Sequence, residues 1–216
     1  MTAKLPPSAS VATTTNGGKL NAPAAERNAD ALTKLLTRIA PPSGTALEIA
    51  SGTGQHVTRF AKAMPNLLWS PSEVAQERID SIKAYRAEAN LTNFHAPILL
   101  DACRPGWSSD LAPFDLILMI NLLHLIPETA AKTLVSEAAS ALKPGGTFMV
   151  YGPFLRDGKT ISDGDTRFHA DLQSADPNIG YKDRDEVLQW GQQAGFRTLE
   201  CVEMPANNLA LIFTAP

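Results

Sequence analysis

The chain has 216 residues, of which 44% are hydrophobic and 19% are charged, with a formal net charge of -3 at pH 7. This composition is typical of one globular domain, and the slight acidity argues against a nucleic-acid-binding surface, which needs clustered positive charge. The sequence contains no apolar run long enough to span a membrane, no signal-peptide pattern and no cysteine motif for a metal, so we expect a cytoplasmic protein in which Cys103 and Cys201 are free thiols.

The spacing of apolar residues predicts helices and strands in alternation. In chain order the predicted elements are a helix at 24–39, a strand at 46–50, a helix at 57–64, a strand at 67–70, a helix at 71–90, strands at 94–100 and 114–120, a helix at 128–142, a strand at 147–151, a helix at 185–194, and strands at 199–204 and 209–214. This order indicates the α/β class, with a doubly wound, mainly parallel seven-stranded sheet of the Rossmann-like type. Right-handed crossovers would then bring the carboxyl ends of the parallel strands to one ligand-binding edge.

Two segments lack this pattern. Residues 1–20 are rich in proline, threonine, asparagine and glycine, and we expect a flexible tail that buries no core, ahead of a single domain at 21–216. Residues 152–180 are rich in glycine, aspartate, proline and serine, with only a short helical pattern at 168–172. Because a loop of this length within a compact domain is usually functional or mobile, we expect it to be a substrate lid.

The strand at 46–50 runs into a turn that contains Gly52 and Gly54. Such a turn presents unpaired backbone N–H groups and the positive end of a helix dipole to a polar, nucleotide-like ligand. Glycine is expected here because a side chain would block close approach of the backbone to the ligand. The dinucleotide fingerprint fails, since Val57 stands at its third glycine, and this disfavours a nicotinamide dehydrogenase.

Counted from Glu48, the same stretch reads Glu-x-Ala-x-Gly-x-Gly, which resembles the first motif of class I methyltransferases that use S-adenosylmethionine (SAM). Ala50 stands where the motif has its first glycine, and Ser51 follows it. The resemblance implies that Glu48 lies near the charged amino-acid end of the cofactor. It also implies that the turn from Ala50 to Gly54 binds the cofactor, whereas a plain tight turn is the alternative for the glycines alone.

Polar residues follow the next three strands as well. Glu73 comes after the second strand, where a carboxylate can accept both hydrogen bonds of a ribose diol; the alternative is an acid stabilised by a helix N-terminus. Asp101, flanked by Ala102, follows the third strand and could accept a hydrogen bond from an adenine amino group, or simply form a turn. Asn121 follows the fourth strand at the same predicted edge, and we expect it to bind the cofactor there as well.

Six further segments stand out along the chain: Ala24-Ala-Glu-Arg-Asn28, Leu47-Glu-Ile-Ala-Ser-Gly-Thr-Gly-Gln-His56, Trp69-Ser-Pro-Ser-Glu73, Asn121-Leu-Leu-His124, Tyr151-Gly-Pro-Phe154 and Glu203-Met-Pro-Ala-Asn-Asn208. Together they resemble one small methyltransferase-like family, catalogued as domain of unknown function 938. The resemblance runs from about residue 22 to the C-terminus and implies a class I SAM-binding fold, with no defined substrate. The usual family residue at position 73 is aspartate, so Glu73 keeps the carboxylate but alters its reach.

Methyl transfer from a sulfonium is an in-line displacement, for which the protein holds the acceptor in line and excludes water. A neutral acceptor also needs a base, and the candidate is His124; the alternative is a histidine that only bonds backbone.

Four residues within the family segments are candidates for binding the substrate. They are Arg27, Asn28, Tyr151 and Asn207. Arg27 could hold a carboxylate, which would need no base. The alternatives are a solvated helix start for Arg27, strand packing for Tyr151 and turn formation for Asn207.

We therefore expect a methyltransferase that converts SAM to S-adenosylhomocysteine (SAH) and methylates a small molecule, more specifically a small carboxylic acid. We expect a monomer or homodimer without a metal, a nucleic-acid partner or a membrane partner. The acids and histidine at 163–171 could suggest metal ligands, although an exposed loop carries such residues too. A non-catalytic SAM- or nucleotide-binding interaction module is the alternative function.

Overall fold

The structure is a computed structural model and describes residues 5–216. Within these residues one sheet contains the strands β3 (Gly44–Ile49), β4 (Leu67–Glu73), β5 (Ile98–Leu99), β6 (Phe114–Ile120), β7 (Leu142–Pro153), β8 (Thr198–Glu203) and β9 (Asn208–Thr214). The α-helices of the same part of the chain are α1 (Pro23–Ile39), α2 (Gln55–Ala63), α3 (Gln76–Ala89), α4 (Glu128–Ser140), α5 (Asp163–Ala175) and α6 (Arg184–Gln193). None of these helices is long and apolar enough to cross a membrane.

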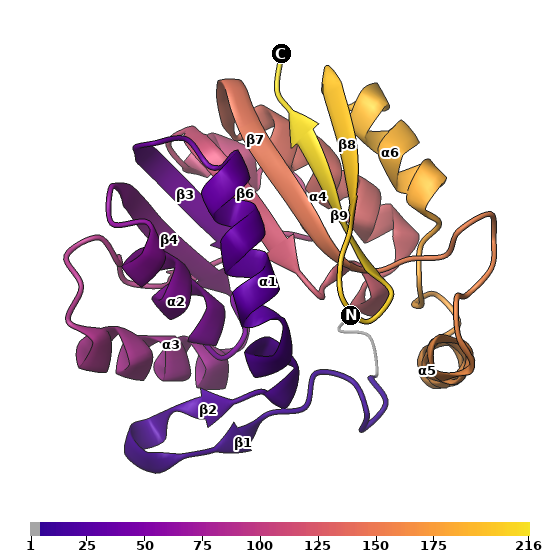
Figure 1. The fold of residues 1–216 in the computed structure, drawn as a ribbon, viewed down its shortest axis with the longest axis horizontal. Coiled ribbons are helices and arrows are strands. Elements are labelled where there is room, and N and C mark those ends of the chain that lie inside the picture. Colours follow the sequence, from indigo (N-terminus) through magenta and orange to yellow (C-terminus); the bar gives the residue numbers. More distant parts are fainter. Residues whose placement is uncertain (1–4) are drawn as a thin grey trace.

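The strand order is β5-β4-β3-β6-β7-β9-β8, as Figure 1 shows. The first five strands pair in parallel, and β9 pairs antiparallel with both β7 and β8. The predicted seven-stranded, mainly parallel sheet of the Rossmann-like type is therefore confirmed. After β3 the chain adds β4 and β5 on one side of that strand, and from β6 onward it adds strands on the other side. The order of the strands therefore reverses between β3 and β6, and open α/β sheets bind ligands at such a point.

Alternate side chains of the central strands enter two separate cores. In β6, Ile117 and Met119 pack with α4 and α6, whereas Leu116 and Leu118 pack with α1 and α2. Since both faces of β6 are covered by helices, its sequence is almost entirely apolar. The strand was predicted over 114–120, and the structure confirms these bounds.

The second strand is longer than predicted. The sequence predicts that a helix begins at Pro71, but β4 continues through Pro71 to Glu73, and α3 begins only at Gln76. Backbone N–H groups of odd-numbered residues in β4 face β5, as shown by the bond from Trp69 N to Asn93 O. Next to Pro71 the partner chain, between His95 and Ile98, is not in a strand, so the missing N–H of proline costs no ladder hydrogen bond.

The third strand is shorter than predicted. Only Ile98–Leu99 forms β5, together with an isolated bridge between Trp69 and Phe94. Pro97 lies between these two contacts and cannot donate to a ladder, which limits this part of the chain to a short edge strand.

The segment 152–180 contains more regular structure than predicted. Its helix α5 has 13 residues and begins where the Ser162 side chain accepts a hydrogen bond from Asp165 N. Leu172 of α5 is fully buried beside Ile179 and Tyr181. The short helix predicted at 168–172 is therefore only the centre of a longer one, and the lid function of the segment stays a prediction.

The N-terminal segment forms a small hairpin of β1 (Thr13–Thr14) and β2 (Leu20–Asn21), beside α3 in Figure 1. Leu20 is buried, and its N–H donates to Ser81 Oγ of α3 at 2.8 Å. Ala9 is buried as well. The expectation that the tail buries no core is therefore wrong at these two residues, while residues 1–4 of the predicted tail lie outside the described residues.

Candidate cofactor and acceptor site

The turn after β3 is built from residues with left-handed backbone conformations. Ala50 has φ 52°, Gly52 has φ 60° and Gly54 has φ 95°. Ser51 connects this turn to β4, because its N–H donates to Ser72 O at 2.8 Å and its hydroxyl oxygen accepts from Ser72 N at 3.2 Å. The same hydroxyl donates to Glu48 O of β3 at 3.1 Å. The predicted strand, turn and helix are thus confirmed, with α2 beginning at Gln55.

The reason for glycine at position 54 differs from the sequence-based expectation. A Cβ there would lie 3.1 Å from Ile82 Cα and 3.2 Å from Ile82 Cγ1, so it would point at α3. A Cβ at Gly52 would also point toward α3, at 3.2 Å from Arg78 Nη1. The expectation that a side chain at Gly54 would block the ligand is therefore wrong; this glycine is required by its left-handed φ together with close packing against α3.

Glu73 is the last residue of β4, and its carboxylate connects β4 to the glycine turn. Its Oε2 accepts a hydrogen bond from Gly52 N at 3.0 Å, and its Oε1 accepts one from Val74 N at 2.8 Å. Because a carboxylate oxygen can accept more than one hydrogen bond, Oε2, which accepts only one, keeps capacity for a ligand hydroxyl. Glu73 lies three residues before α3, and its Oε1 also accepts a longer hydrogen bond, of 3.5 Å, from the N–H of Ala75, the N-cap of that helix. The alternative of an acid stabilised by the helix N-terminus therefore stays open beside the ribose role.

Glu48 is only 1% exposed, and its Oε2 has no hydrogen-bond partner within residues 5–216. Burial raises the pKa of this carboxyl to about 8, and the charge of Glu73 raises it further, against the lowering effect of a hydrogen bond with Ser51. Buried polar atoms without a partner are rare because they are costly. This oxygen beside the glycine turn is thus suited to bind an ammonium group, such as the one at the amino-acid end of a cofactor.

Asn28, His56 and Tyr151 form a buried polar group on the α1 and α2 side of the sheet. Asn28 Oδ1 lies 2.7 Å from His56 Nε2, and a hydrogen bond with Asn28 opposes the rise in the pKa of Tyr151 that burial causes. Burial lowers the pKa of His56 to about 4, so the imidazole is neutral at pH 7. His56 belongs to one of the family segments, but the sequence indicates no role for it, because a histidine at a helix start has no local signature. Arg27, by contrast, is exposed.

Asn121 and His124 meet at the carboxyl ends of β6 and β7. A Cβ at Gly152 would lie 3.7 Å from Asn121 Oδ1 and 3.9 Å from His124 Nδ1, so two polar atoms converge over a position that has no side chain. The ring of His124 makes edge contacts with Phe168 and Tyr181, at centroid distances of 5.7 and 6.0 Å. Asn121, His124 and Gly152 therefore lie at the part of the sheet's carboxyl edge that is away from Glu73.

His124 is 6% exposed, and burial lowers its pKa from 6.5 to about 3, with a smaller contribution from the charge of Lys182. The imidazole is therefore neutral at pH 7 and holds an added proton only weakly. Such a ring can donate or accept a hydrogen bond, but it is a poor general base.

Asp101 makes contacts that match its structural alternative of a turn residue, whereas the side chain of Asn207 contacts another element. Asp101 Oδ1 accepts from Cys103 N at 3.1 Å, and its Oδ2 pairs with Arg104 Nε at 3.0 Å, as in a turn; Ala102 beside it is buried. Asn207 Nδ2 donates to Asp165 Oδ2 at 3.0 Å, which connects the turn between β8 and β9 to α5.

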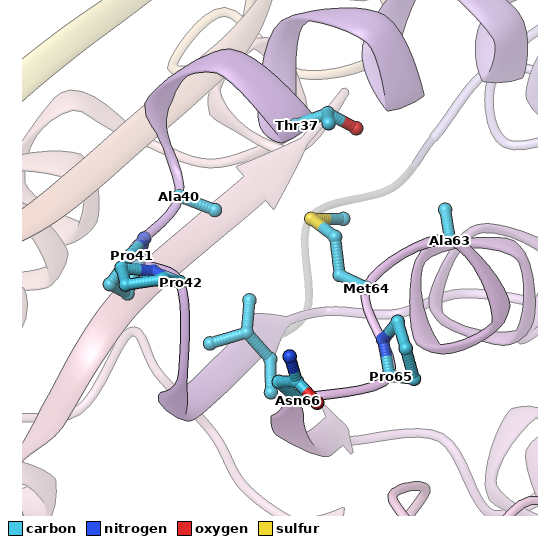
Figure 2. A pocket seen from close by; sticks show the side chains of 9 residues that line it. Thr37, Ala40, Pro41, Pro42, Ala63, Met64, Pro65 and Asn66 are labelled. Carbon is cyan, nitrogen blue, oxygen red and sulfur yellow. The ribbon is translucent and has the colours of Figure 1, made fainter.

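The cavity shown in Figure 2 lies elsewhere, at the amino ends of β3 and β4. It has a volume of about 220 Å³ and is lined by Pro41, Pro42, Met64 and Pro65, among others. None of its lining residues is charged. It therefore offers no group for acid, base or cofactor chemistry.

Solved structures of methyltransferases share this fold. They include an O-methyltransferase family protein from Burkholderia thailandensis (14% identity, TM-score 0.71, 87% of this chain and 58% of that chain). They also include a putative O-methyltransferase from Nostoc punctiforme (18%, 0.74, 86% and 55%) and human N-acetylserotonin methyltransferase in complex with SAM (14%, 0.69, 87% and 54%). The chain thus spans little more than half the length of these proteins, and the likeness establishes the class I methyltransferase fold.

A family model gives the closer relationship. The model described as "Protein of unknown function (DUF938)" matches residues 19–215, which is nearly the whole chain and includes every predicted site residue. The chain therefore belongs to the DUF938 family.

Proposed function

We propose that this chain is a SAM-dependent methyltransferase that acts on a small molecule, and that it methylates an oxygen of a small carboxylic acid. The observation that carries the proposal is the meeting of Gly52 N, the Glu73 carboxylate and the unpartnered Glu48 Oε2 around one turn. The Glu73 carboxylate can accept hydrogen bonds from the ribose hydroxyls of SAM, and Glu48 Oε2 can accept one from its ammonium group. The methyltransferase fold and the SAM complex of the human neighbour support the proposal.

In this proposal Glu73 binds the ribose, Glu48 binds the amino group, and the turn from Ala50 to Gly54 packs on the cofactor between them. Asp101 and Ala102 lie at the adenine end. When bound, SAM supplies a methyl group on a positively charged sulfur. Asn121 and His124 hold the acceptor near Gly152, and Arg27 and Asn28 approach it from α1, with Tyr151 and Asn207 at the margin of the same pocket.

The low pKa of His124 favours an acceptor that is already deprotonated. A carboxylate attacks without losing a proton, so the neutral His124 ring needs only to orient it through a hydrogen bond. A phenol or an amine would need a base, and His124 with a pKa of about 3 is a weak one. This is why we prefer a carboxylic acid among small acceptors.

The pH dependence of turnover tests this preference. With saturating SAM and a carboxylic acid acceptor, kcat is expected to stay within about twofold between roughly pH 6 and pH 8, because the acceptor stays ionised and His124 stays neutral. Initial rates across this range measure it. A tenfold rise of kcat per pH unit would instead indicate an acceptor that must be deprotonated.

A second prediction concerns the proton of Glu48. With a pKa of about 8 this carboxyl is protonated at pH 7 in the free protein, and a ligand ammonium beside it favours the ionised form. SAH binding at pH 7 is therefore expected to release about one proton from wild-type protein and none from Glu48→Gln. Calorimetric titration in two buffers that differ in ionisation enthalpy measures the difference; equal proton release would contradict the role given to Glu48.

The Glu48 carboxyl also makes the free energy of unfolding depend on pH. Its pKa is raised above the ordinary value of 4.5, so between about pH 4.5 and pH 8 the unfolded chain has lost a proton that the folded chain keeps. The contribution of Glu48 to the free energy of unfolding therefore falls as pH rises through this window. Glu48→Gln should flatten this slope in urea denaturation of the ligand-free protein.

Calorimetric titration with SAM and SAH, followed by a methyl-transfer assay, tests the proposed function as a whole. The assay panel contains small acids, phenols and amines, with radiolabelled SAM as methyl donor. We expect SAM binding and ester formation with at least one acid. SAM binding without transfer to any panel member would favour the non-catalytic binding module, and absence of SAM binding would contradict the proposed methyltransferase.

A further inference from the structure

Residues 5–12, here called the N-terminal strap, cross the carboxyl edge of the sheet between α3 and α5. In Figure 1 the indigo chain before β1 runs below the strand ends in this direction. At the α5 end, Leu5, Pro6, Pro7 and Ser8 line a surface hollow together with residues of α5. The strap precedes the region matched by the family model, which begins at residue 19.

Two successive strap residues contact the two halves of the candidate site. Ala9 packs beside Leu172 and Tyr181, and the Tyr181 ring contacts His124. On the other side, Arg78 Nη2 donates to Ser10 O at 3.1 Å and to Ser10 Oγ at 2.8 Å.

The same guanidinium reaches the glycine turn, since Arg78 Nη1 lies 3.2 Å from the position of a Cβ at Gly52. The strap therefore joins residues beside the glycine turn to residues on the acceptor side, across the edge at which the cofactor is proposed to bind.

The contacts that hold the strap are few. They comprise the two hydrogen bonds from Arg78, of which the donor is half-buried, and the small apolar contact of Ala9. Ser10 has φ 58°, a left-handed conformation that is unfavourable for a residue other than glycine. Val11 remains 49% exposed. Opening the strap thus costs little free energy, unlike opening any part of the sheet.

We propose that the strap is a gate for the cofactor, held shut by Arg78 and Ala9, which slows both the entry and the departure of SAM and SAH. This inference rests on the proposed function, because it assumes that the cofactor lies between the glycine turn and His124. A gate that closes equally well over the empty and the filled site changes both rate constants by the same factor and leaves Kd unchanged.

Stopped-flow mixing of the full-length protein with SAH tests the gate. Trp107 provides a fluorescence signal, since its Nε1 donates to Ala102 O at the same edge. In Arg78→Gln and in Ala9→Glu, association and dissociation should both become about tenfold faster, with Kd within about twofold, since the loss of a charge-assisted hydrogen bond corresponds to roughly this factor. Lys83→Gln, on the same helix but away from the strap, is the control and should leave both rates unchanged.

The outcomes separate the gate from the proposed function. If wild-type protein binds SAH and neither variant changes the rates, the gate is wrong and the proposed function stands. Faster association with unchanged dissociation would also overturn the gate, because the strap would then only compete with the ligand. If the wild type does not bind SAH at all, the proposed function fails and the gate with it. Thermal unfolding shows whether each variant is folded. If Ala9→Glu does not fold, the rates of Arg78→Gln decide the test.

Discussion

Replacing Glu73 with alanine is expected to weaken SAH binding at least about 100-fold, because each charge-assisted hydrogen bond to a ribose hydroxyl contributes roughly 1.5–3 kcal/mol. The buried carboxylate also orients the glycine turn through its bond with Gly52 N, so its loss affects two surfaces of the ligand at once. Calorimetric titration with SAH measures the affinity, and circular dichroism shows whether the variant keeps the fold.

Two further variants make this result specific. Glu77→Ala removes an exposed carboxylate from the first turn of α3 and should leave the affinity unchanged. Glu73→Asp keeps the charge with a shorter reach and should lie between wild type and alanine. An affinity of Glu73→Ala within twofold of wild type would remove Glu73 from the cofactor site.

Substituting Gly54 with alanine is expected to cost the fold about 3 kcal/mol of unfolding free energy. Its φ of 95° is unfavourable for any L-residue by about 1–2 kcal/mol. A new Cβ would also lie 3.1 Å from the backbone of Ile82, and such overpacking adds roughly 1–3 kcal/mol. Urea denaturation measures the loss.

Gly106 provides a matched control. Its φ is 91°, but a Cβ there would meet nothing within 4 Å. Gly106→Ala should therefore lower the free energy of unfolding only by the cost of the left-handed backbone conformation, about 1 kcal/mol. Equal losses at the two positions would mean that α3 does not pack on Gly54 as described, and that the glycine turn is held only by its backbone conformation.

The sheet was predictable because its patterns are local. The run Phe114–Ile120 is apolar on both faces, and its bounds needed no knowledge of its neighbours. Pro71 misled the prediction for the second strand, because proline at a helix start is more familiar than proline within a strand. Whether its missing N–H matters depends on the irregular partner segment before Ile98, which no local pattern reveals.

The sequence predicts which strands carry the candidate site residues, but it does not predict the packing around them. The sequence predicts Glu48, Glu73 and Asn121 at or near the carboxyl ends of their strands, and the structure confirms these positions, while their binding roles stay predictions. The direction of a Cβ at Gly54 could not be predicted, because it depends on where α3 packs. His56 was missed because a histidine in a helix start has no local signature. The strap was missed because its contacts, from Ala9 to Leu172 and from Ser10 to Arg78, join segments far apart in the sequence.

A crystal of the protein soaked with SAH tests the central claim most directly. We predict electron density along the carboxyl edge of the sheet, with the ribose within hydrogen-bond distance of Glu73, the amino group beside Glu48 Oε2 and the sulfur toward His124. Density for SAH at another surface, or a well-ordered edge without SAH at a saturating concentration, would contradict the account.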